Sequence, residues 1–266
     1  MAETGLPFDV SGKAEGTDPI VLVPGGLSGW VSWKPHAEIL SKQFEVVRVQ
    51  LLNMAAAERG EEPGRGYSLR AESEALGMTL DTLGYRTVNL VGWSHGGAVS
   101  LDFALDHPGR LHTLTLIEPA AYWAARGDAR FAEEEAAFRG FFSGLHEPVN
   151  EEDLIGFLNL NGLVPSGADP RSMPRWPIWN SLKVALKSLN TVFDHQDEIS
   201  RLSRLSDVPI LLVKGRDSVG LNSGIVEVLS DAIGSTAKVL VLPDGHACHI
   251  VAMQQFINEL KKHVVT

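Results

Sequence analysis

The sequence predicts an α/β fold, with a mostly parallel sheet covered by helices on both faces and a helical cap inserted into the chain. Three observations predict this fold. Short apolar runs rich in β-branched residues alternate with longer helical patterns. The runs are continuously apolar, as in strands that are buried on both faces. One connection spans about 90 residues, whereas a βαβ crossover needs only about a dozen.

Six apolar runs are the predicted strands, at 19–26, 44–52, 87–93, 111–119, 209–215 and 237–245. Helical patterns between them cover 70–84, 96–109, 223–234 and 249–263. Two of these helices end at a glycine, Gly84 and Gly234, as helix C-termini prefer. The long connection predicts a helical cap over 119–205, so that the core consists of 1–118 and 206–266.

The composition indicates an ordinary globular protein, with 44% hydrophobic and 21% charged residues among 266. A formal charge of −10 disfavours nucleic acid and anionic membranes as partners. No stretch approaches the ~18 apolar residues of a membrane span, and the N-terminus lacks an export-signal pattern. We therefore expect a soluble, cytoplasmic protein that acts on a small molecule, either as a monomer or as a homodimer. The single cysteine, Cys248, excludes an intrachain disulfide.

The predicted strand at 87–93 runs directly into GWSHGG, at residues 92–97, and then into a helix. This is G-x-S-x-G in the strand-turn-helix context of a nucleophile elbow. The turn lifts the hydroxyl of Ser94 clear of the sheet, and Gly92 and Gly96 remove β-carbons that would collide. The following helix N-terminus offers free N–H groups to a developing oxyanion. Ser94 is therefore the predicted nucleophile.

The elbow, the earlier VPGGLSGWVSW and the later PDGHACH occur in the order of the α/β-hydrolase fold superfamily, which the chain resembles from about residue 19 onward. The resemblance implies a serine-nucleophile enzyme without a cofactor. It also implies that the N–H groups of Gly26 and His95 form the oxyanion hole. Family members usually have a histidine at the end of the first core strand, where this chain has Pro24. The backbone N–H donors that follow are unaffected by this replacement.

A general base is required because a serine hydroxyl is a poor nucleophile at neutral pH. Of nine histidines, His246 follows a predicted strand and a tight turn, where α/β sheets build their sites, and it matches the family's late Gly-His. His249 is the second candidate. The spacing of His246, Cys248 and His249 is unlike known zinc sites, so no metal is expected. The other histidines are predicted to lie on the surface: His36, His107, His112, His146, His195 and His263.

Two carboxylates compete to orient the histidine. In much of the family the acid follows the penultimate strand, three residues after a glycine, and counting from Gly215 places Ser218 in that slot. Asp217 lies one residue earlier, which in an extended segment turns its side chain to the opposite face.

Glu118 is the other candidate, at the end of the strand that follows the elbow helix. Sequential strands usually lie side by side, so this position should be near Ser94, and Pro119 should hold Glu118 in an extended conformation. Lactonases resembling the zearalenone-hydrolysing enzymes take their acid from this position. Glu118 is therefore the predicted acid, with Asp217 as the alternative.

The insertion is rich in aromatic residues, which predicts an apolar, aromatic substrate held by Leu27, Trp123, Trp176 and Trp179. A cofactor-independent serine hydrolase that cleaves a carboxylic ester or a lactone is the predicted function. Two alternatives stay open, because a fold does not determine a reaction. One is a C–C bond hydrolase, lyase or cofactor-free oxygenase on the same fold, and the other is a weakly catalytic ligand-binding receptor.

Overall fold

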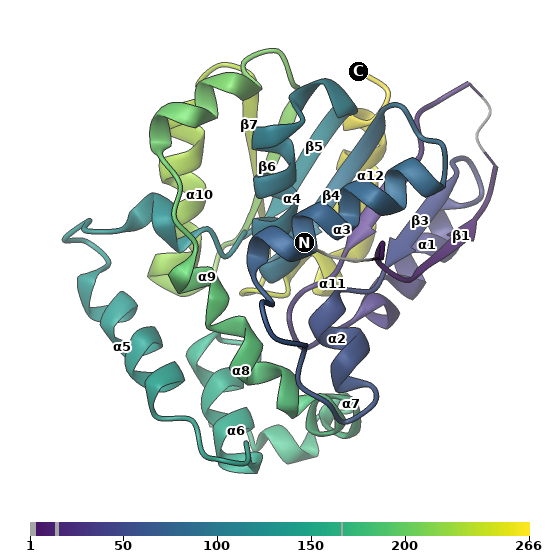
Figure 1. Ribbon diagram of the computed structural model, residues 1–266. Coiled ribbons are helices and arrows are strands. Elements are labelled where there is room, and N and C mark those ends of the chain that lie inside the picture. Colours follow the sequence, from purple (N-terminus) through teal and green to yellow (C-terminus); the bar gives the residue numbers. More distant parts are fainter. Residues whose placement is uncertain (1–3, 14–15, 166) are drawn as a thin grey trace.

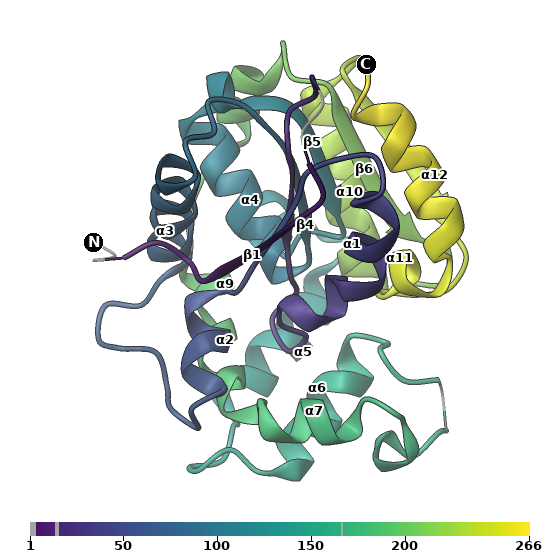
Figure 2. The same cartoon turned by 90° about the vertical axis from the view of Figure 1, so that its right-hand side faces the viewer.

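The computed structural model describes residues 4–13, 16–165 and 167–266, so the first three residues of the N-terminus lie outside it. Within these residues the core is a seven-stranded sheet in the order β1-β3-β2-β4-β5-β6-β7 (Figures 1 and 2). β1 pairs antiparallel with β3, and the other neighbouring strands are parallel. The prediction of a mostly parallel α/β sheet is confirmed. The strands are β1 (Phe8–Ser11), β2 (Ile20–Val23), β3 (Val46–Val49), β4 (Val88–Trp93), β5 (Leu111–Ile117), β6 (Ile210–Gly215) and β7 (Ala237–Leu242).

Helices cover both faces of the sheet, as Figures 1 and 2 show. One face carries α3 (Leu69–Thr82), α4 (His95–Asp106) and α10 (Gly220–Ile233). The other carries α1 (Lys34–Leu40), α11 (Cys248–Val251) and α12 (Met253–His263). Side chains of β2 alternate between the two cores, with Val21 and Val23 in one and Ile20 and Leu22 in the other. β2 therefore has apolar residues at every position.

The segment between β5 and β6, which we call the cap, forms a layer of short helices beside the carboxyl ends of the strands. Helices α5 to α8 lie together below the sheet in Figures 1 and 2. The cap helices are η3 (Tyr122–Ala125), α5 (Ala132–Ser143), α6 (Glu151–Leu160), η4 (Pro170–Ser172), α7 (Trp176–Ser181), η5 (Lys183–Ala185), α8 (Leu186–Leu189), α9 (Thr191–Asp194) and η6 (Ile199–Leu205).

Several elements differ from the sequence prediction. β1 is a short antiparallel edge strand with three exposed residues, so it lacks an apolar run. The predicted strand at 44–52 is a strand only over Val46–Val49, and α2 (Leu52–Ala57) begins at its end. The final helix is interrupted at Ala252, which separates α11 from α12. η1 (Trp30–Trp33), α1 and η2 (Pro108–Arg110) were also not predicted.

β7 is not buried on both faces as its apolar run predicted. It forms the edge of the sheet, and the side chains of Val239 and Val241 are 44% and 46% exposed. Strand order accounts for this exposure, because β7 is at the edge of the sheet and has a neighbouring strand on one side only.

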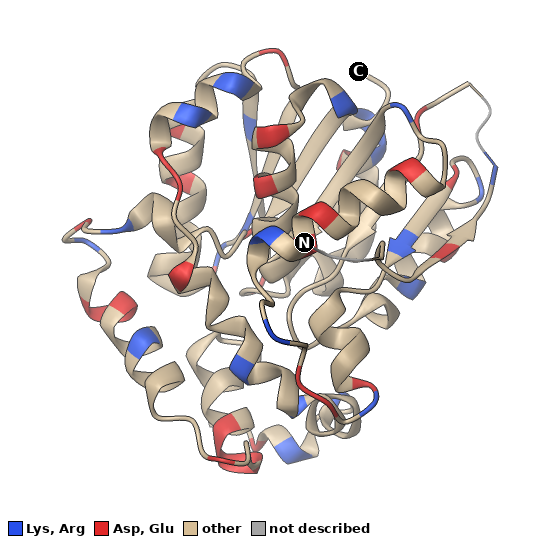
Figure 3. Ribbon diagram, viewed as in Figure 1, with Lys and Arg blue, Asp and Glu red and all other residues tan. Residues whose placement is uncertain are grey.

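Basic residues are interspersed with acidic ones along the same helices (Figure 3). On α5, Arg139 pairs with Glu135 one turn earlier at 2.8 Å. On α8, Lys187 pairs with Glu62 of the core at 2.7 Å and with Glu147 of the cap. Among the described residues, no helix is both long enough and apolar enough to cross a membrane.

Candidate active site

The nucleophile elbow joins β4 to α4, with Ser94 as the residue between them. Its backbone has φ 54° and ψ −118°, a region that costs a non-glycine residue roughly 1–3 kcal/mol. Surrounding contacts hold this conformation, since the Ser94 N–H donates to the Ile117 carbonyl at 2.9 Å. A β-carbon on Gly96 would lie 2.3 Å from the Pro24 carbonyl oxygen, and one on Gly92 would lie 2.4 Å from Ser100 Oγ. The tight packing of helix against strand explains both glycines.

Ser94, His246 and Glu118 form a continuous hydrogen-bonded chain. Ser94 Oγ lies 2.9 Å from His246 Nε2, and His246 Nδ1 lies 2.7 Å from Glu118 Oε2. A carboxylate can only accept, so Nδ1–H donates to Glu118 and Nε2 is free to accept the serine proton. The indole N–H of Trp93 donates to the His246 carbonyl at 3.0 Å and fixes the loop. Three segments that are far apart in the sequence thus meet at the carboxyl edge of the sheet.

Glu118 does not have the extended backbone that the following proline predicted. Its φ is 38°. Among the described residues, the non-glycine residues with positive φ are Ser94, Glu118 and Asp244. All three lie in or next to the hydrogen-bonded chain of Ser94, His246 and Glu118, since Asp244 is two residues before His246. Proline disfavours the right-handed helical region for the preceding residue, but packing at the strand end selects a left-handed conformation instead of an extended one.

Two further groups donate to the Glu118 carboxylate. The Gly215 N–H donates to Oε1 at 2.7 Å, and the Ser218 hydroxyl donates to Oε2 at 2.6 Å. Burial tends to raise the pKa of Glu118, but the hydrogen bonds from His246, Ser218 and Gly215 outweigh burial and hold this pKa below its ordinary value. Glu118 is therefore an ionised carboxylate, which is the form that stabilises an imidazolium.

Asp217 lies on the surface, where its side chain is 60% exposed and pairs with Arg216 at 3.3 Å. Its N–H donates to the Asp244 carbonyl at 3.0 Å, and the hydrogen bonds described for His246 Nδ1 include Glu118 but not Asp217. The neighbouring Ser218, in the family's acid slot, points instead to Glu118. The two candidate acids thus occupy different environments, and Glu118 is the one in contact with the histidine.

Gly26 and His95 face the same small cavity as Ser94. His95 is the first residue of α4, so its N–H has no acceptor within the helix. Gly26 follows β2, next to β4 in the sheet, where the strand order changes direction. A β-carbon on Gly26 would lie 2.4 Å from Cδ2 of Leu189, a cap residue that covers this position.

The cavity at Ser94 has a volume of only ≈ 30 Å³, which is space for about two water molecules. Its aromatic lining comes from Tyr122, Phe138, Phe142 and Phe157, and Asn161, Leu189 and Val192 complete the cap side. Phe138 and Phe142 are four residues apart on α5, a spacing that places both on one face of the helix. This spacing is the signal in the sequence that could have identified them.

The residues predicted to contact substrate lie elsewhere. Leu27 and Trp179 line a separate pocket with Arg175. Trp123 is buried in the core, and the Trp176 ring packs under the Arg171 guanidinium. Aromatic composition therefore predicted the character of the cavity, whereas helix orientation decided which rings line it.

Three of the six histidines predicted to lie on the surface, His107, His112 and His146, are exposed, and the other three need correction. His36 and His263 are buried, at 1% and 7% exposed, and the His195 side chain is 10% exposed. His36 Nε2 donates to the His249 carbonyl at 3.0 Å beneath the site. His249 is fully buried, and its ring packs 4.6 Å from the Trp93 ring. Polar residues directly precede His195 and His263 in the sequence, so their burial comes from contacts with distant segments, such as Asp102 beside His195 and the Leu114 carbonyl beside His263.

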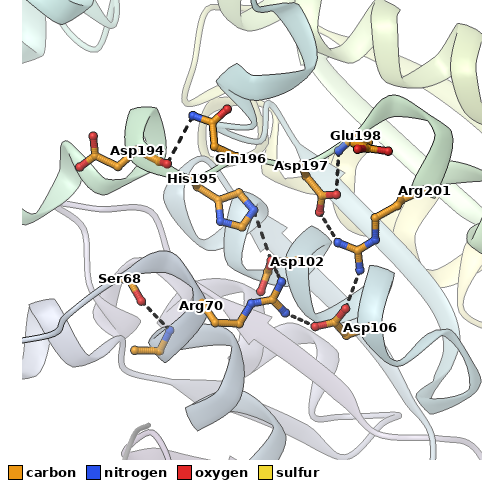
Figure 4. Close-up of polar contacts among 11 residues, drawn as sticks. Ser68, Arg70, Asp102, Asp106, Asp194, His195, Gln196, Asp197, Glu198 and Arg201 are labelled. Atoms are coloured by element: carbon orange, nitrogen blue, oxygen red, sulfur yellow. Dashed lines mark hydrogen bonds and ion pairs between the residues drawn. The ribbon is translucent and has the colours of Figure 1, made fainter.

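A second polar cluster connects the end of the cap to α4, the helix that follows Ser94 (Figure 4). The Arg201 guanidinium bridges Asp106 at 2.5 Å and Asp197 at 2.7 Å. Arg70 of α3 pairs with Asp106 and also with Asp102 at 3.0 Å. The α4 carboxylates thus hold both α3 and the segment that leads from the cap back to the core.

Asp102, His195 and Asp197 within this cluster are close enough for their ligand atoms to lie within 4.8 Å of one another. Such a set could hold a metal ion. However, Asp102 already contacts Arg70 and His195, and Asp197 contacts Arg201. These guanidinium groups stay protonated in proteins and supply the positive charge that a cation would otherwise bring.

With the fold and this geometry established, comparisons with known proteins identify the family. A sequence profile described as alpha/beta hydrolase fold matches residues 18–252. The chain belongs to the alpha/beta hydrolase fold family. The match confirms the predicted superfamily, and together with esterases among the relatives it confirms the prediction of a hydrolytic enzyme.

The chain is 28% identical over 271 residues to a pimeloyl-[acyl-carrier protein] methyl ester esterase of Aeromonas hydrophila subsp. hydrophila, covering 98% of this chain and all of that protein. An esterase of Exiguobacterium antarcticum superposes with a TM-score of 0.74 at 19% identity, covering 100% of this chain and 98% of that one. The enol-lactonase of Burkholderia xenovorans LB400 superposes with a TM-score of 0.68 at 18% identity, covering 98% and 96%. The resemblance to zearalenone-hydrolysing lactonases stays a prediction.

Proposed function

We propose that the protein is a cofactor-independent serine hydrolase that cleaves a carboxylic ester or a lactone with an apolar, aromatic group beside the carbonyl. The observation that carries this proposal is the Ser94–His246–Glu118 chain, with contacts of 2.9 and 2.7 Å. Each contact has the direction that general-base activation of a serine requires.

In the proposed reaction, Ser94 Oγ attacks the substrate carbonyl carbon while its proton moves to His246 Nε2. Glu118 stabilises the imidazolium that forms, and the N–H groups of Gly26 and His95 bind the oxyanion. The imidazolium then protonates the leaving alkoxide, which leaves an acyl-enzyme. Water, deprotonated by the same histidine, attacks the acyl carbon and releases a carboxylic acid with Ser94 restored.

Two observations support the substrate class. The rings of Phe138, Phe142 and Phe157 line the cavity next to Ser94 and favour an apolar group there. Esterases and a lactonase occur among the relatives and structural neighbours. Because the cavity holds about two water molecules, substrate entry requires the cap side chains over Ser94 to move apart.

A panel of aryl esters and lactones tests the proposal. We expect an initial burst of the alcohol or phenol product, as an acyl-enzyme accumulates. Ser94→Ala should lose this burst and labelling by a fluorophosphonate, while His112→Ala, at an exposed position, should retain both. Labelling of Ser94→Ala, or the absence of a burst with every ester, would favour the C–C hydrolase, lyase, oxygenase or receptor alternatives.

A further inference from the structure

A buried polar chain behind the oxyanion residues is not used by the proposed reaction. It begins at His95, whose Nε2 lies 3.2 Å from the hydroxyl of Tyr67. It continues to Glu72 of α3, a carboxylic acid with no exposed surface. A buried acid is costly unless it is fully hydrogen-bonded, so its partners should reveal its role.

Glu72 caps α2 from another part of the chain. Its Oε2 accepts from the Leu52 N–H at 2.8 Å, and its Oε1 accepts from the Asn53 N–H at 3.0 Å. These are the first two residues of α2, whose N–H groups have no acceptor within the helix. Burial raises the pKa of Glu72 to about 7, while hydrogen bonds from Leu52, Asn53 and the Tyr67 hydroxyl lower it.

The groups around Glu72 indicate which members of this hydrogen-bonded series donate and which accept. Both carboxylate oxygens accept a backbone N–H, and the Tyr67 hydroxyl lies close enough to the carboxylate to help lower its pKa. A Tyr67 hydroxyl that turns its hydrogen towards this carboxylate accepts Nε2–H of His95, 3.2 Å away. The buried His95 ring, whose pKa burial lowers to about 4, is thereby held as one neutral tautomer.

In the other direction, α2 connects Glu72 to the cap. The Asn53 side-chain amide donates to Ser188 Oγ at 3.1 Å, in a fully buried contact. Ser188 precedes Leu189, whose side chain covers Gly26. The chain thus joins His95 to the cap residue above Gly26, and so reaches both residues that supply the proposed oxyanion N–H groups.

We propose that Glu72 is a positioning residue, which holds the His95 side chain through Tyr67 and holds Leu189 of the cap through α2. This proposal rests on the proposed function, because it assigns Glu72 a role only if His95 and Gly26 bind an oxyanion. Glu72 itself does not touch the reacting atoms, and its effect is transmitted by the contacts described above.

Tyr67→Phe and Glu72→Gln, alone and together, test this role in the full-length protein with an aryl ester. The first removes only the hydroxyl, and the second places an amide NH2 opposite backbone N–H donors. We expect each to lower kcat about tenfold or more, because small misplacements of catalytic groups cost up to about 100-fold. The double variant should be little worse than the worse single variant, because both changes break one chain. Ser188→Ala, which removes the hydrogen bond between Asn53 and the cap, should raise KM more than it lowers kcat.

Thr79→Val is the matched control, because Thr79 is also buried on α3 and, among the described residues, its hydroxyl hydrogen-bonds only to Leu6 and Ala75. It should lower Tm without lowering kcat. An unchanged kcat in Tyr67→Phe and Glu72→Gln, or effects that multiply in the double variant, would overturn the proposal. If Glu72→Gln does not fold, the comparison of kcat between Tyr67→Phe and the control Thr79→Val tests the proposal. In all cases Ser94→Ala shows separately whether the serine mechanism itself has failed.

Discussion

The hydroxyl of Ser218 donates a 2.6 Å hydrogen bond to Oε2 of Glu118, the same oxygen that accepts from His246. Ser218 occupies the position where the sequence pattern of many alpha/beta hydrolases has the acid, and Glu118 comes from the end of β5. The carboxylate and the usual acid slot therefore meet in space although they are 100 residues apart. One carboxylate, Glu118, thus lies beside His246, and Ser218 at the usual acid position donates a hydrogen bond to that carboxylate.

Glu118→Gln should lower kcat by about 10⁴-fold, the loss seen when an acid that orients a catalytic histidine becomes an amide. Asp217→Asn should leave kcat within about twofold, since surface substitutions away from special contacts have small effects. Parallel kinetics with one ester measure both. A large loss confined to Asp217→Asn would mean that the wrong carboxylate has been assigned.

Ser218→Ala should lower kcat by roughly 10-fold, because a hydrogen bond to a charged group contributes about 1.5–3 kcal/mol. The loss of this donor also raises the pKa of Glu118, which the Ser218 hydroxyl helps to keep low. Less of the enzyme is then active as pH falls, so the acidic limb of the kcat/KM profile should shift to higher pH. A profile identical to that of the unmodified protein would contradict this.

Leu189→Ala should enlarge the cavity above Gly26 and favour bulkier esters. The side chain of Leu189 is 3% exposed and lies where a β-carbon on Gly26 would be. We expect KM for a bulky aryl ester to fall while that for a small ester stays unchanged, with a loss of stability of about 2–5 kcal/mol. Steady-state kinetics on both esters, together with a denaturant titration, provide the measurement. Equal effects on the two esters would argue against Leu189 as a limit on substrate size.

The free energy of unfolding should fall as pH decreases from about 6.5 towards 4. Burial lowers the pKa of His36 from 6.5 to about 4, although its hydrogen bond to the His249 carbonyl raises it. Over this range the unfolded chain binds a proton that the folded chain does not, so acidification favours unfolding. His36→Gln keeps a donor for the carbonyl but removes the titration, and should reduce the slope by up to about 1.4 kcal/mol per pH unit. Denaturant titrations at several pH values measure this slope, and an unchanged slope would exclude His36 as its source.

Asp106→Asn should loosen the cap without affecting chemistry. Asp106 is the carboxylate that pairs with both Arg70 and Arg201 at the end of the cap (Figure 4). Because its side chain is 33% exposed, we expect a modest loss of stability, about 1 kcal/mol. Tm and kcat should be measured together. A large fall in kcat at an unchanged Tm would mean that the cluster acts on the active site rather than on cap attachment.

Features of this protein that depend on local chemistry can be predicted from the order of its residues. Parallel strands that are buried on both faces favour long apolar runs, and the elbow around Ser94 requires glycines where a β-carbon would collide. Both leave a readable pattern, and so does the 90-residue interruption that forms the cap.

Which side chains come into contact depends instead on how distant segments pack together. The exposure of β7, the burial of His36 and the left-handed backbone of Glu118 all depend on neighbours that are distant in the sequence. The same is true of the rings that line the cavity and of the contact between Glu72 and α2. A side chain's partner is selected by strand order, helix orientation and packing, and these are properties of the whole chain rather than of any short segment.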